Sequence, residues 1–490
     1  METEELKFMH DKYVEMKGTI EKTTTVLHEF GGNIREKYHI GYPLEGTARS
    51  SIAQFRNCIH RDLNLKRAIK SYYIADAIFS NSSVSFTSHP LMNFELILNE
   101  IKALSELNHP NIIRLYDVYF DSKYIHLVTD FCKGGELFEL LYLDRLSVDD
   151  SLGIYIQIIE AIKFIHSKGY CHRGLCIENI MFADNDKKKV KIIGFSGAIK
   201  MNGPMRYKYG SPMYMAPEVF QENYTELCDE WSAGVIFFTM VTGHQPFQSS
   251  DFRKLSKCVQ GRDFIRSENW KAQSKLVKKF IKKILEVKNR PNAQKILEMP
   301  LIKKYQKENN KQAIKKLMRT IKSIKPDSSF SLKIKLSNKI KIAVYKILST
   351  LNVLHDLNGL EGLWNELDID GSEMLMESDI VNNIERVLNK QELSHRAHQI
   401  IKKFDLDRRG CVTKDEFIGL LCDLTDKNLL MQAFNILDFD CNGIISPTDF
   451  DTYFKCTDYE NLAKLMQEAN GTTSLDYESF SLLVTKFVIN

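Results

Sequence analysis

The segment Cys171–Ile180 reads CHRGLCIENI, and it decides the fold because it stands at the centre of a series of short motifs. Five further motifs surround it in a fixed order: NHPNIIRLYDVYFDSKYIHLVTD (108–130), GGELF (134–138), IGFS (193–196), GSPMYMAPE (210–218) and CDEWS (228–232). Strand-like patterns come first in this region and helical patterns follow them. This order predicts a domain of the α+β class over residues 38–305.

The length and composition indicate a soluble protein of several domains. A chain of 490 residues is too long for one hydrophobic core, and 43% hydrophobic with 27% charged residues is ordinary for a soluble protein. No apolar run approaches the ~18 residues of a membrane span, so we expect no integral membrane segment. The acidic start predicts no signal peptide, and residue 2 is not the glycine of N-myristoylation. Ten cysteines without a CxxC pair suit free thiols in a reducing, cytoplasmic setting.

Charge is distributed unevenly along the chain. The net charge is +4, but the part from Asp356 onward carries about −13 and the rest about +17. This asymmetry suggests that the two parts attract each other, or that the acidic part collects cations. The basic part shows no aromatic-basic stripe and no known reader motif, so we expect no nucleic-acid partner.

The acidic part repeats a helix, an Asp-rich loop and another helix at a spacing of about 35 residues. In loop two (405–416), oxygen-bearing side chains fall at positions 1, 3, 9 and 12, with glycine at position 6 and an apolar residue at position 8. This resembles the EF-hand calcium loop, in which six to eight oxygens surround a hard cation and the glycine permits a sharp turn. Loop three (438–449), loop one (368–379) and a degenerate loop four near 470–475 repeat the pattern.

The loops differ in how well they suit calcium. Loop three is the best candidate, although Asp449 replaces the usual bidentate Glu. Loop two has cationic Arg409 where an oxygen is wanted, loop one has Glu373 where glycine should turn, and loop four has lost most carboxylates. The predicted ligands are Asp438, Asp440, Asn442, Ile444 and Asp449 in loop three, Asp405, Asp407, Cys411 and Glu416 in loop two, and Asp368, Asp370, Ser372 and Asp379 in loop one. For at least one loop, the alternative is a structural module that keeps only its helix pairing.

The motifs around Cys171–Ile180 resemble the protein-kinase signatures in order and spacing across about 265 residues. Together with the acidic repeats, they make the chain similar to the calcium-dependent protein kinases of plants and protists over nearly its whole length. The resemblance implies a two-lobed protein-kinase fold, then a basic helical junction, then an all-α, calmodulin-like EF-hand domain. The expected regions are an N-terminal extension (1–37), the kinase-like domain (38–305), the junction (306–350) and the calmodulin-like domain (351–490).

By this resemblance, four positions belong to nucleotide binding: Lys70, Glu100, Gly46 and Thr129. Lys70 matches the strand lysine that holds the α- and β-phosphates, and Glu100 matches the helix residue that orients it. Of the Gly-rich phosphate loop only Gly46 remains, out of register, and Thr129 falls at the gatekeeper position. Two interpretations stay open: a salt bridge that ties a strand to a helix in an empty cleft, or a site that holds ATP without productive Mg²⁺.

At three positions that hold catalytic residues in the family, this chain has residues that cannot perform the same chemistry. Gly174 stands where the family has the Asp that accepts the substrate proton, and Cys176 stands where a Lys steadies the γ-phosphate. Gly194 replaces the Mg²⁺-binding Asp of the DFG motif, whereas Asn179, a further Mg²⁺ ligand, is retained. These replacements predict a pseudokinase.

Other positions keep the family's residues. Glu218 and Arg290 match a buried ion pair that secures the activation segment, and Asp229 matches the helix residue that braces the catalytic loop. Glu136 and Glu178 match positions that pair with arginine on substrate peptides in basophilic kinases. Solvated surface acids are the alternative interpretation of these two residues.

The segment from Lys303 to Lys346 holds about 14 basic residues against two acidic ones, with apolar residues at helical spacing. A basic amphipathic helix suits an acidic EF-hand groove. In the family, this segment is an autoinhibitory junction that calcium-loaded EF-hands seize. A solvated basic helix and a membrane-surface helix are the alternatives.

We therefore predict a calcium-responsive pseudokinase. Ca²⁺ on the EF-hands would control the chain's own linker (306–350), and through it the binding of an unidentified protein, an active kinase or a substrate. One alternative is a weakly active, ATP-dependent serine/threonine kinase regulated by calcium, which would have to recruit another acid. Asp184 and Asp186 are near in sequence, but in the family this turn points away from the cleft. The other alternative is a static calcium-binding module.

Overall fold

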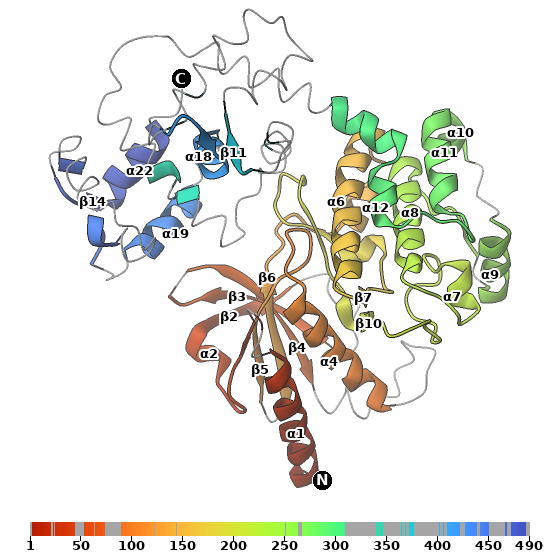
Figure 1. The fold of residues 1–490 in the computed structure, drawn as a ribbon. Coiled ribbons are helices and arrows are strands. Elements are labelled where there is room, and N and C mark those ends of the chain that lie inside the picture. Colours follow the sequence, from red (N-terminus) through yellow and green to blue (C-terminus); the bar gives the residue numbers. More distant parts are fainter. Residues whose placement is uncertain are drawn as a thin grey trace, which may run out of the picture. The chain divides into compact units, whose positions relative to one another are not determined.

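The computed structural model divides the chain into two compact units, Met1–Tyr305 and Gln306–Asn490 (Figure 1). It describes residues 2–20, 23, 25–44, 53–62, 64–73, 90–121, 123–143, 145–249, 251–262, 267–308, 340–342, 344–345, 364, 368, 372–376, 401, 405, 409–421, 427–438, 442–449, 466–467 and 472–486. Most of the predicted linker and five predicted site residues lie outside the described residues: Gly46, Asp370, Asp379, Asp407 and Asp440.

A six-stranded sheet forms the N-terminal lobe of the first unit, with the strand order β1-β5-β6-β4-β3-β2. The strands are β1 (Val26–Leu27), β2 (Tyr38–Pro43), β3 (Ala53–His60), β4 (Lys66–Tyr73), β5 (Leu115–Phe120) and β6 (Tyr124–Asp130). Strand β1 pairs in parallel with β5, and the other neighbours are antiparallel. Helix α4 (Pro90–Glu106) buries Phe94 and Ile101 in the same core as Val118 and Leu127 of the sheet.

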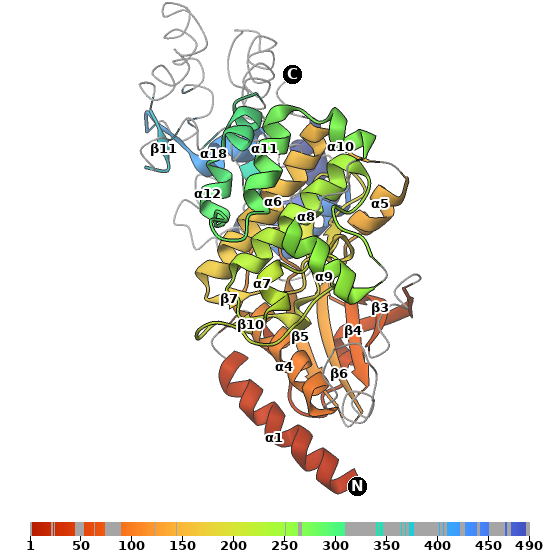
Figure 2. The same cartoon turned by 90° about the vertical axis from the view of Figure 1, so that its right-hand side faces the viewer.

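The N-terminal extension adds a helix and a strand to this lobe. Helix α1 (Glu2–Ile20) lies beside α4 (Figures 1 and 2) and buries Tyr13, Met16 and Ile20, whose spacing places them on one helix face. The ring of Tyr13 meets that of Phe120 on β5 edge to face, with centroids 5.9 Å apart. The extension therefore belongs to the core of the lobe, although the sequence predicted only a weak helical pattern.

A buried carboxylate ties the extension to the sheet. Asp117 on β5 accepts hydrogen bonds from Nε2 of His28 at 2.7 Å, from Nζ of Lys37 at 2.8 Å and from the hydroxyl of Tyr38. Lys37 ends the short helix α2 (Ile34–Lys37), which begins at the side-chain cap of Asn33. Burial opposes the charge of Asp117, but the three donors hold its pKa below the usual value.

The second lobe of this unit is mostly helical. Its elements are α5 (Leu137–Leu143), α6 (Val148–Ser167), β7 (Tyr170–Cys171), η1 (Ile177–Asn179), β8 (Ile180–Phe182), β9 (Val190–Ile192), η2 (Phe195–Gly197), β10 (Ile199–Lys200), α7 (Pro217–Phe220), α8 (Leu227–Thr242), α9 (Phe252–Gly261), α10 (Glu268–Ala272), α11 (Lys275–Ile284) and α12 (Ala293–Leu297). Side-chain caps start several helices: Ser147, Asp251, Ser267, Ser274 and Asn292. Helix α8 is buried from Cys228 to Thr242 and runs beside α6 (Figures 1 and 2), so it forms the centre of the lobe.

In the second unit, two pairs of two-residue strands join the predicted loops. Strand β11 (Met374–Leu375) in loop one pairs antiparallel with β12 (Val412–Thr413) in loop two. Strand β13 (Ile444–Ile445) in loop three pairs in the same way with β14 (Leu475–Asp476) in loop four. The residues at position eight of the loops, predicted to be apolar, are buried and face one another as Leu375 with Val412 and Ile445 with Leu475.

Helices α18 (Lys414–Leu421), α19 (Lys427–Leu437) and α22 (Tyr477–Lys486) complete the described part of this unit. The end of the predicted linker packs here, because Ile340, Val344 and Tyr345 are buried. Its Ile342 lies so close to Gly419 of α18 that a Cβ on this glycine would be 3.2 Å from the Cα of Ile342. Glycine at 419 therefore permits a close approach of linker and helix.

Two expectations from the sequence, on membrane-spanning segments and on free cysteines, can be compared with the described residues. No helix in them combines the length and the apolar character that crossing a membrane requires. Seven of the ten cysteines lie in these ranges, and all seven are free thiols.

Candidate functional site

Lys70 and Glu100 meet between the sheet and helix α4. Nζ of Lys70 on β4 lies 2.8 Å from Oε1 and 2.9 Å from Oε2 of Glu100. The hydroxyl of Tyr72, two residues along β4, also donates to Glu100, and the Lys70 ammonium lies 4.9 Å from the Tyr72 ring centroid. The predicted strand-to-helix pair is thus formed and largely buried, with 17% of the Lys70 side chain and 5% of the Glu100 side chain exposed.

The catalytic-loop segment keeps a regular hydrogen-bond pattern without an acid. The amide of Gly174 donates to Nδ1 of His172 at 3.1 Å, and the imidazole Nε2 lies 3.1 Å from the carbonyl oxygen of Ile193. Burial lowers the pKa of His172, so the ring is neutral and donates to Ile193 through Nε2. The ring of Phe195 packs on it edge to face at 4.5 Å. The loop therefore holds its shape through His172 and presents no carboxylate at Gly174.

Asn179 occupies the space beside Gly194. Gly194 has a φ of 78°, and a Cβ built there would lie 2.5–2.8 Å from the side-chain amide atoms of Asn179. That amide donates from Nδ2 to the carbonyl oxygen of Gly174 at 2.7 Å. Asn179 thus bonds to one of the two glycines and fills the space into which a side chain at the other, Gly194, would project.

Asp184 and Asp186 were considered as substitutes for the missing carboxylate. They lie at the end of the β8–β9 hairpin that is remote from Asn179. Strands β8 and β9 pair from Ile180 with Ile192 to Phe182 with Val190, and Asn179 lies at one end of this pairing. Asp184 and Asp186 lie in the turn at the opposite end, where the Asp184 carbonyl lies against Gly134. Strands of three residues at ~3.3 Å each separate them from Gly194 by roughly 10 Å. Neither acid is placed to replace the missing carboxylate.

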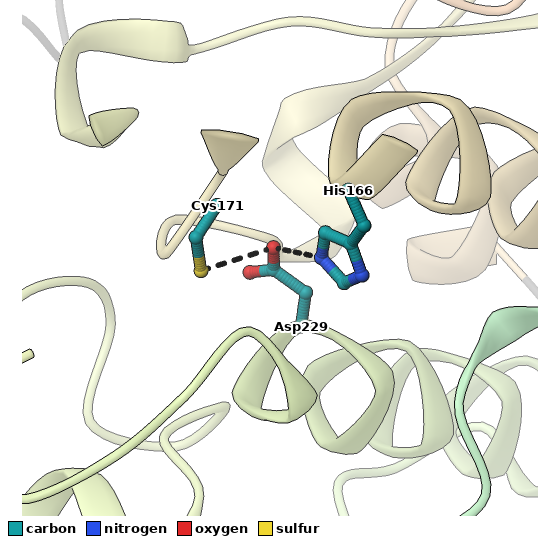
Figure 3. Close-up of side chains that lie close together, drawn as sticks. All are labelled: His166, Cys171 and Asp229. Carbon is teal, nitrogen blue, oxygen red and sulfur yellow. Dashed lines mark hydrogen bonds and ion pairs between the residues drawn. The ribbon is translucent and has the colours of Figure 1, made fainter. Parts of the chain in front are cut away.

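Asp229 on helix α8 braces the catalytic loop (Figure 3). Its Oδ2 accepts from the amide of His172 and its Oδ1 from the amide of Arg173, both at 2.8 Å. Nε2 of His166 on α6 lies 3.0 Å from Oδ2, and the Cys171 thiol lies 3.3 Å from it. Asp229 was predicted as a bracing residue, whereas His166 was missed because no motif contains it.

His166, Cys171 and Asp229 are close enough to hold a metal ion, since their ligand atoms lie within 4.8 Å of one another. His166 and Cys171 keep their protons, however, and hydrogen-bond to Asp229. Burial lowers the pKa of His166, but hydrogen bonds to Asp229 and Glu230 outweigh it and raise the pKa to about 10, so the ring is a cation at neutral pH. Burial also raises the pKa of the Cys171 thiol well above its usual value. Because metal ligation requires both groups deprotonated, the geometry favours a hydrogen-bonded brace.

A second buried contact secures the segment that follows. The Arg290 guanidinium lies against the Glu218 carboxylate through two nitrogens, with Nη2 at 3.2 Å from Oε2. It also donates to the carbonyl of Leu227 at 2.6 Å and stacks over the Trp231 ring at 5.0 Å. The two residues predicted as a structural ion pair are therefore brought together, and they join α7 to the start of α8.

The activation segment lies directly on the catalytic loop. The ring of Tyr209 covers Gly197 so closely that a Cβ there would be 2.1 Å from a ring carbon. Its hydroxyl is 3.1 Å from Oγ of Ser196, and the Arg173 guanidinium lies over the ring at 5.3 Å. A Cβ at Gly210 would be 2.5 Å from the Arg173 carbonyl oxygen. Sequence reasoning missed Tyr209, because glycine at 197 becomes informative only when its neighbour in space is known.

The remaining predicted positions lie on nearby elements. Thr129 on β6 is paired with Ala68 of β4, two residues from Lys70 along that strand. Burial raises the pKa of the Cys176 thiol, so this residue is a neutral thiol, and a cysteine has no cationic form that could replace the family's lysine. Glu136 and Glu178 are half-buried and belong to neighbouring parts of the fold, just before α5 and in η1. Their role in a peptide groove stays a prediction.

In the second unit, the first acid of loops one, two and three is held by the loop backbone. Asp438 accepts from the amides of Asn442 and Gly443 at 3.0 and 2.9 Å. Asp368 and Asp405 make the equivalent bonds, to Ser372 and Glu373 and to Arg409 and Gly410. Asp449 of loop three accepts from the Ser446 amide at 2.7 Å. These acids turn their oxygens into the loops, as a calcium site requires.

Restoring the two acids should have unequal effects on stability. At Gly174 a Cβ would have its nearest neighbours at 3.6 Å, an ordinary contact distance, so Gly174→Asp meets no steric conflict and should destabilise the fold less than Gly194→Asp does. At Gly194 the positive φ and the crowding by Asn179 should make Gly194→Asp cost about 1–3 kcal/mol. Denaturant unfolding measures both. In an Asn179→Ala background the Gly194→Asp cost should fall, and an undiminished cost would show that Asn179 does not fill this space.

The charge of His166 should make stability depend on pH. Its folded pKa of about 10 lies above the unfolded value of about 6.5, so its contribution is complete below about pH 6.5 and declines as the pH rises toward 10. His166→Gln should therefore cost about 2–4 kcal/mol near pH 6 and clearly less near pH 9. Denaturant unfolding of both proteins at the two pH values tests this. A gap between wild type and variant that is equal at both would contradict the charged state.

Comparison with known proteins agrees with this geometry. Residues 51–302 match the family described as protein kinase domain. The chain is 30% identical to calcium-dependent protein kinase 5 of Plasmodium falciparum over 415 residues, which cover 80% of this chain and 71% of the relative. It is 29% identical to calcium-dependent protein kinase 5 of Plasmodium berghei, covering 72% and 63%, and 27% identical to calcium-dependent protein kinase 3 of Plasmodium yoelii yoelii, covering 86% and 75%. The two-lobed fold, the motif order and these similarities together show that the chain belongs to the calcium-dependent protein kinase family.

Proposed function

We propose that this chain is a calcium-responsive pseudokinase. One observation carries the proposal: the two positions that hold catalytic acids in the family are Gly174 and Gly194, and the Asn179 side chain fills the space beside Gly194. A glycine can neither accept a proton from a substrate hydroxyl nor bind Mg²⁺ through a side chain. Asn179, the one Mg²⁺-ligand position that the chain shares with the family, donates from Nδ2 to the Gly174 carbonyl, which leaves one amide oxygen and no carboxylate for Mg²⁺.

The size of these losses favours inactivity. A positioned base contributes typically 10²–10⁴-fold to a rate. A metal clamp contributes several kcal/mol of charge stabilisation, and each ~1.36 kcal/mol is a factor of ten in rate. The two effects need not add fully, but together with the altered phosphate loop around Gly46 they leave little phosphoryl transfer. Asp184 and Asp186, at the far end of the β8–β9 hairpin, are poorly placed to compensate.

What the chain keeps supports a role in binding. Asp229 still braces the catalytic loop, and Glu218 with Arg290 still fixes the activation segment. A kinase-shaped surface is thereby maintained without its chemistry. We propose that this surface binds a protein partner, an active kinase or its substrate, and that Lys70 could pair with the phosphates of ATP without a productive Mg²⁺.

The second unit is the part of the chain that would bind calcium. The inward-turned acids of loops one to three and the strand pairs between loops support four EF-hands, and the relatives' names state calcium dependence. Loop three fits best: Asp438, Asn442, the Ile444 carbonyl and Asp449 would hold Ca²⁺, with Asp440 added from the sequence. Ca²⁺ binding there would draw in the part of the basic linker that precedes its packed end, which begins at Ile340, and would change the surface that the kinase-like unit offers.

A weakly active kinase is the second candidate. The observation in its favour is the intact Lys70–Glu100 pair, with Nζ 2.8 Å from Oε1, together with the intact brace at Asp229. In that case, another acid would have to direct Mg²⁺. Phosphoryl transfer separates the two candidates directly.

The purified full chain with ATP, Mg²⁺ and Ca²⁺ should transfer no phosphate to itself or to a basic peptide, because no acid is placed at positions 174 and 194. Radiolabelled ATP measures this, with Lys70→Met as the matched control. Transfer that persists in Lys70→Met would come from a contaminant. Transfer that this substitution abolishes would establish the weak kinase and overturn the pseudokinase.

Calcium should change the linker. In hydrogen exchange, residues 306–350 of the full chain should gain protection when Ca²⁺ is added, and Asp438→Ala should remove that gain because it deletes the first ligand of loop three. Glu478→Ala, at an exposed acid of α22, is the control and should behave like wild type. A wild-type chain that binds Ca²⁺ with no change in this segment would establish the static module.

A further inference from the structure

Loop two departs from its neighbours at one side chain. Its backbone has the same arrangement as loop three: Asp405 accepts from the amides of residues 409 and 410 at 3.0 and 2.7 Å, as Asp438 does from those of Asn442 and Gly443. Gly410 and Gly443 adopt nearly the same positive φ, 85° and 83°. These described parts of the two loops match, and the difference that changes the charge of the site is the side chain at position five.

In loop two, this side chain is Arg409, and it reaches the acid at position twelve. Its Nη2 lies 3.4 Å from Oε2 of Glu416. The same carboxylate oxygen accepts from the amide and the hydroxyl of Thr413 at 2.9 and 2.7 Å. The Glu416 side chain is 8% exposed, whereas the Arg409 side chain is 48% exposed. A nearly buried carboxylate is thus neutralised by a guanidinium that extends to it from the surface.

Loop three has a neutral residue at the same position. Oδ1 of Asn442 accepts from the amide of Ile444 at 2.9 Å, so an oxygen stands where loop two has a cation. The acid at position twelve, Asp449, is 4% exposed and accepts from the amide and hydroxyl of Ser446. It therefore retains a buried negative charge that suits Ca²⁺, whereas the charge of Glu416 is already balanced.

We propose that Arg409 is a built-in cation that takes the place of calcium in loop two, so that this loop keeps its folded shape without Ca²⁺ and does not bind it. The proposal rests on the proposed function, because it takes the loops to be EF-hands. A guanidinium is permanently charged and has a fixed fork of donors. It therefore pairs with Glu416 at every physiological pH and repels a divalent ion from the site.

With Arg409 in the place of calcium, the pair of loops one and two has a different function from the pair of loops three and four. Helix α18 starts directly after β12 of loop two and carries Gly419, which contacts Ile342 at the end of the linker. A loop held by its own arginine keeps this contact in the absence of calcium. Loops one and two then hold the linker end permanently, while loop three supplies the calcium response.

The test is the number of calcium ions that the full chain binds, measured by titration calorimetry in wild type, Arg409→Asn and Lys414→Asn. Arg409→Asn gives loop two the residue of loop three, and should raise the stoichiometry by one. It should also lower the thermal midpoint in a calcium chelator and recover it when Ca²⁺ is added. Lys414→Asn removes the same charge five residues away and should leave the stoichiometry unchanged.

Each outcome decides between the accounts. A wild-type stoichiometry that falls by one in Glu416→Gln would show that loop two already binds Ca²⁺, and an unchanged stoichiometry in Arg409→Asn would show that Arg409 is not what excludes it. Either result overturns the inference while the calcium response of loop three stands. Failure of the wild-type chain to bind any Ca²⁺ would instead overturn the proposed function.

Discussion

The buried carboxylate of Asp229 is the interaction on which the catalytic region depends. It accepts the amides of His172 and Arg173 and is itself held by the His166 cation, so the loop is fixed from beneath by helix α8. The charge is retained because burial, which opposes it, is outweighed by these hydrogen bonds, and the pKa of Asp229 is lowered. None of these contacts involves the position of the missing acid, and this is why the loop keeps its shape with glycine at 174.

The shape of the catalytic region therefore does not depend on acids at positions 174 and 194 in this chain. Asn179 donates to the carbonyl of Gly174 and fills the space beside Gly194. Tyr209 covers Gly197, and the N-terminal extension is fixed to the sheet by Asp117. Each contact stabilises the two-lobed body, and none requires an acid at position 174 or 194. In the second unit, the Arg409 guanidinium lies 3.4 Å from the buried Glu416 carboxylate, and the proposal for loop two rests on this ion pair.

The sequence predicted what depends on motifs and missed what depends on contacts in space. The two-lobed kinase fold and the family followed from motif order, and the expected partners Lys70 with Glu100 and Glu218 with Arg290 do meet. The ion pair of Arg409 with Glu416 was missed, although Arg409 had been noted as an unsuitable ligand. The N-terminal extension was underestimated, because the buried Tyr13, Met16 and Ile20 share helix α1 with apolar residues off that face, such as the exposed Val14, which weakens the periodic signal. His166 and Tyr209 were missed because their partners are remote in sequence.

The central claim is that this cleft cannot direct Mg²⁺ to a nucleotide. Calorimetric titration of the full chain with ATP, once with Mg²⁺ and once with a metal chelator, tests it most directly. The account predicts that Mg²⁺ leaves the ATP affinity unchanged or weakens it, because ion binding to the phosphates finds no protein carboxylate at positions 174 and 194. An ATP affinity that Mg²⁺ strengthens tenfold or more, about 1.4 kcal/mol, would show that another acid holds the ion and would contradict the account.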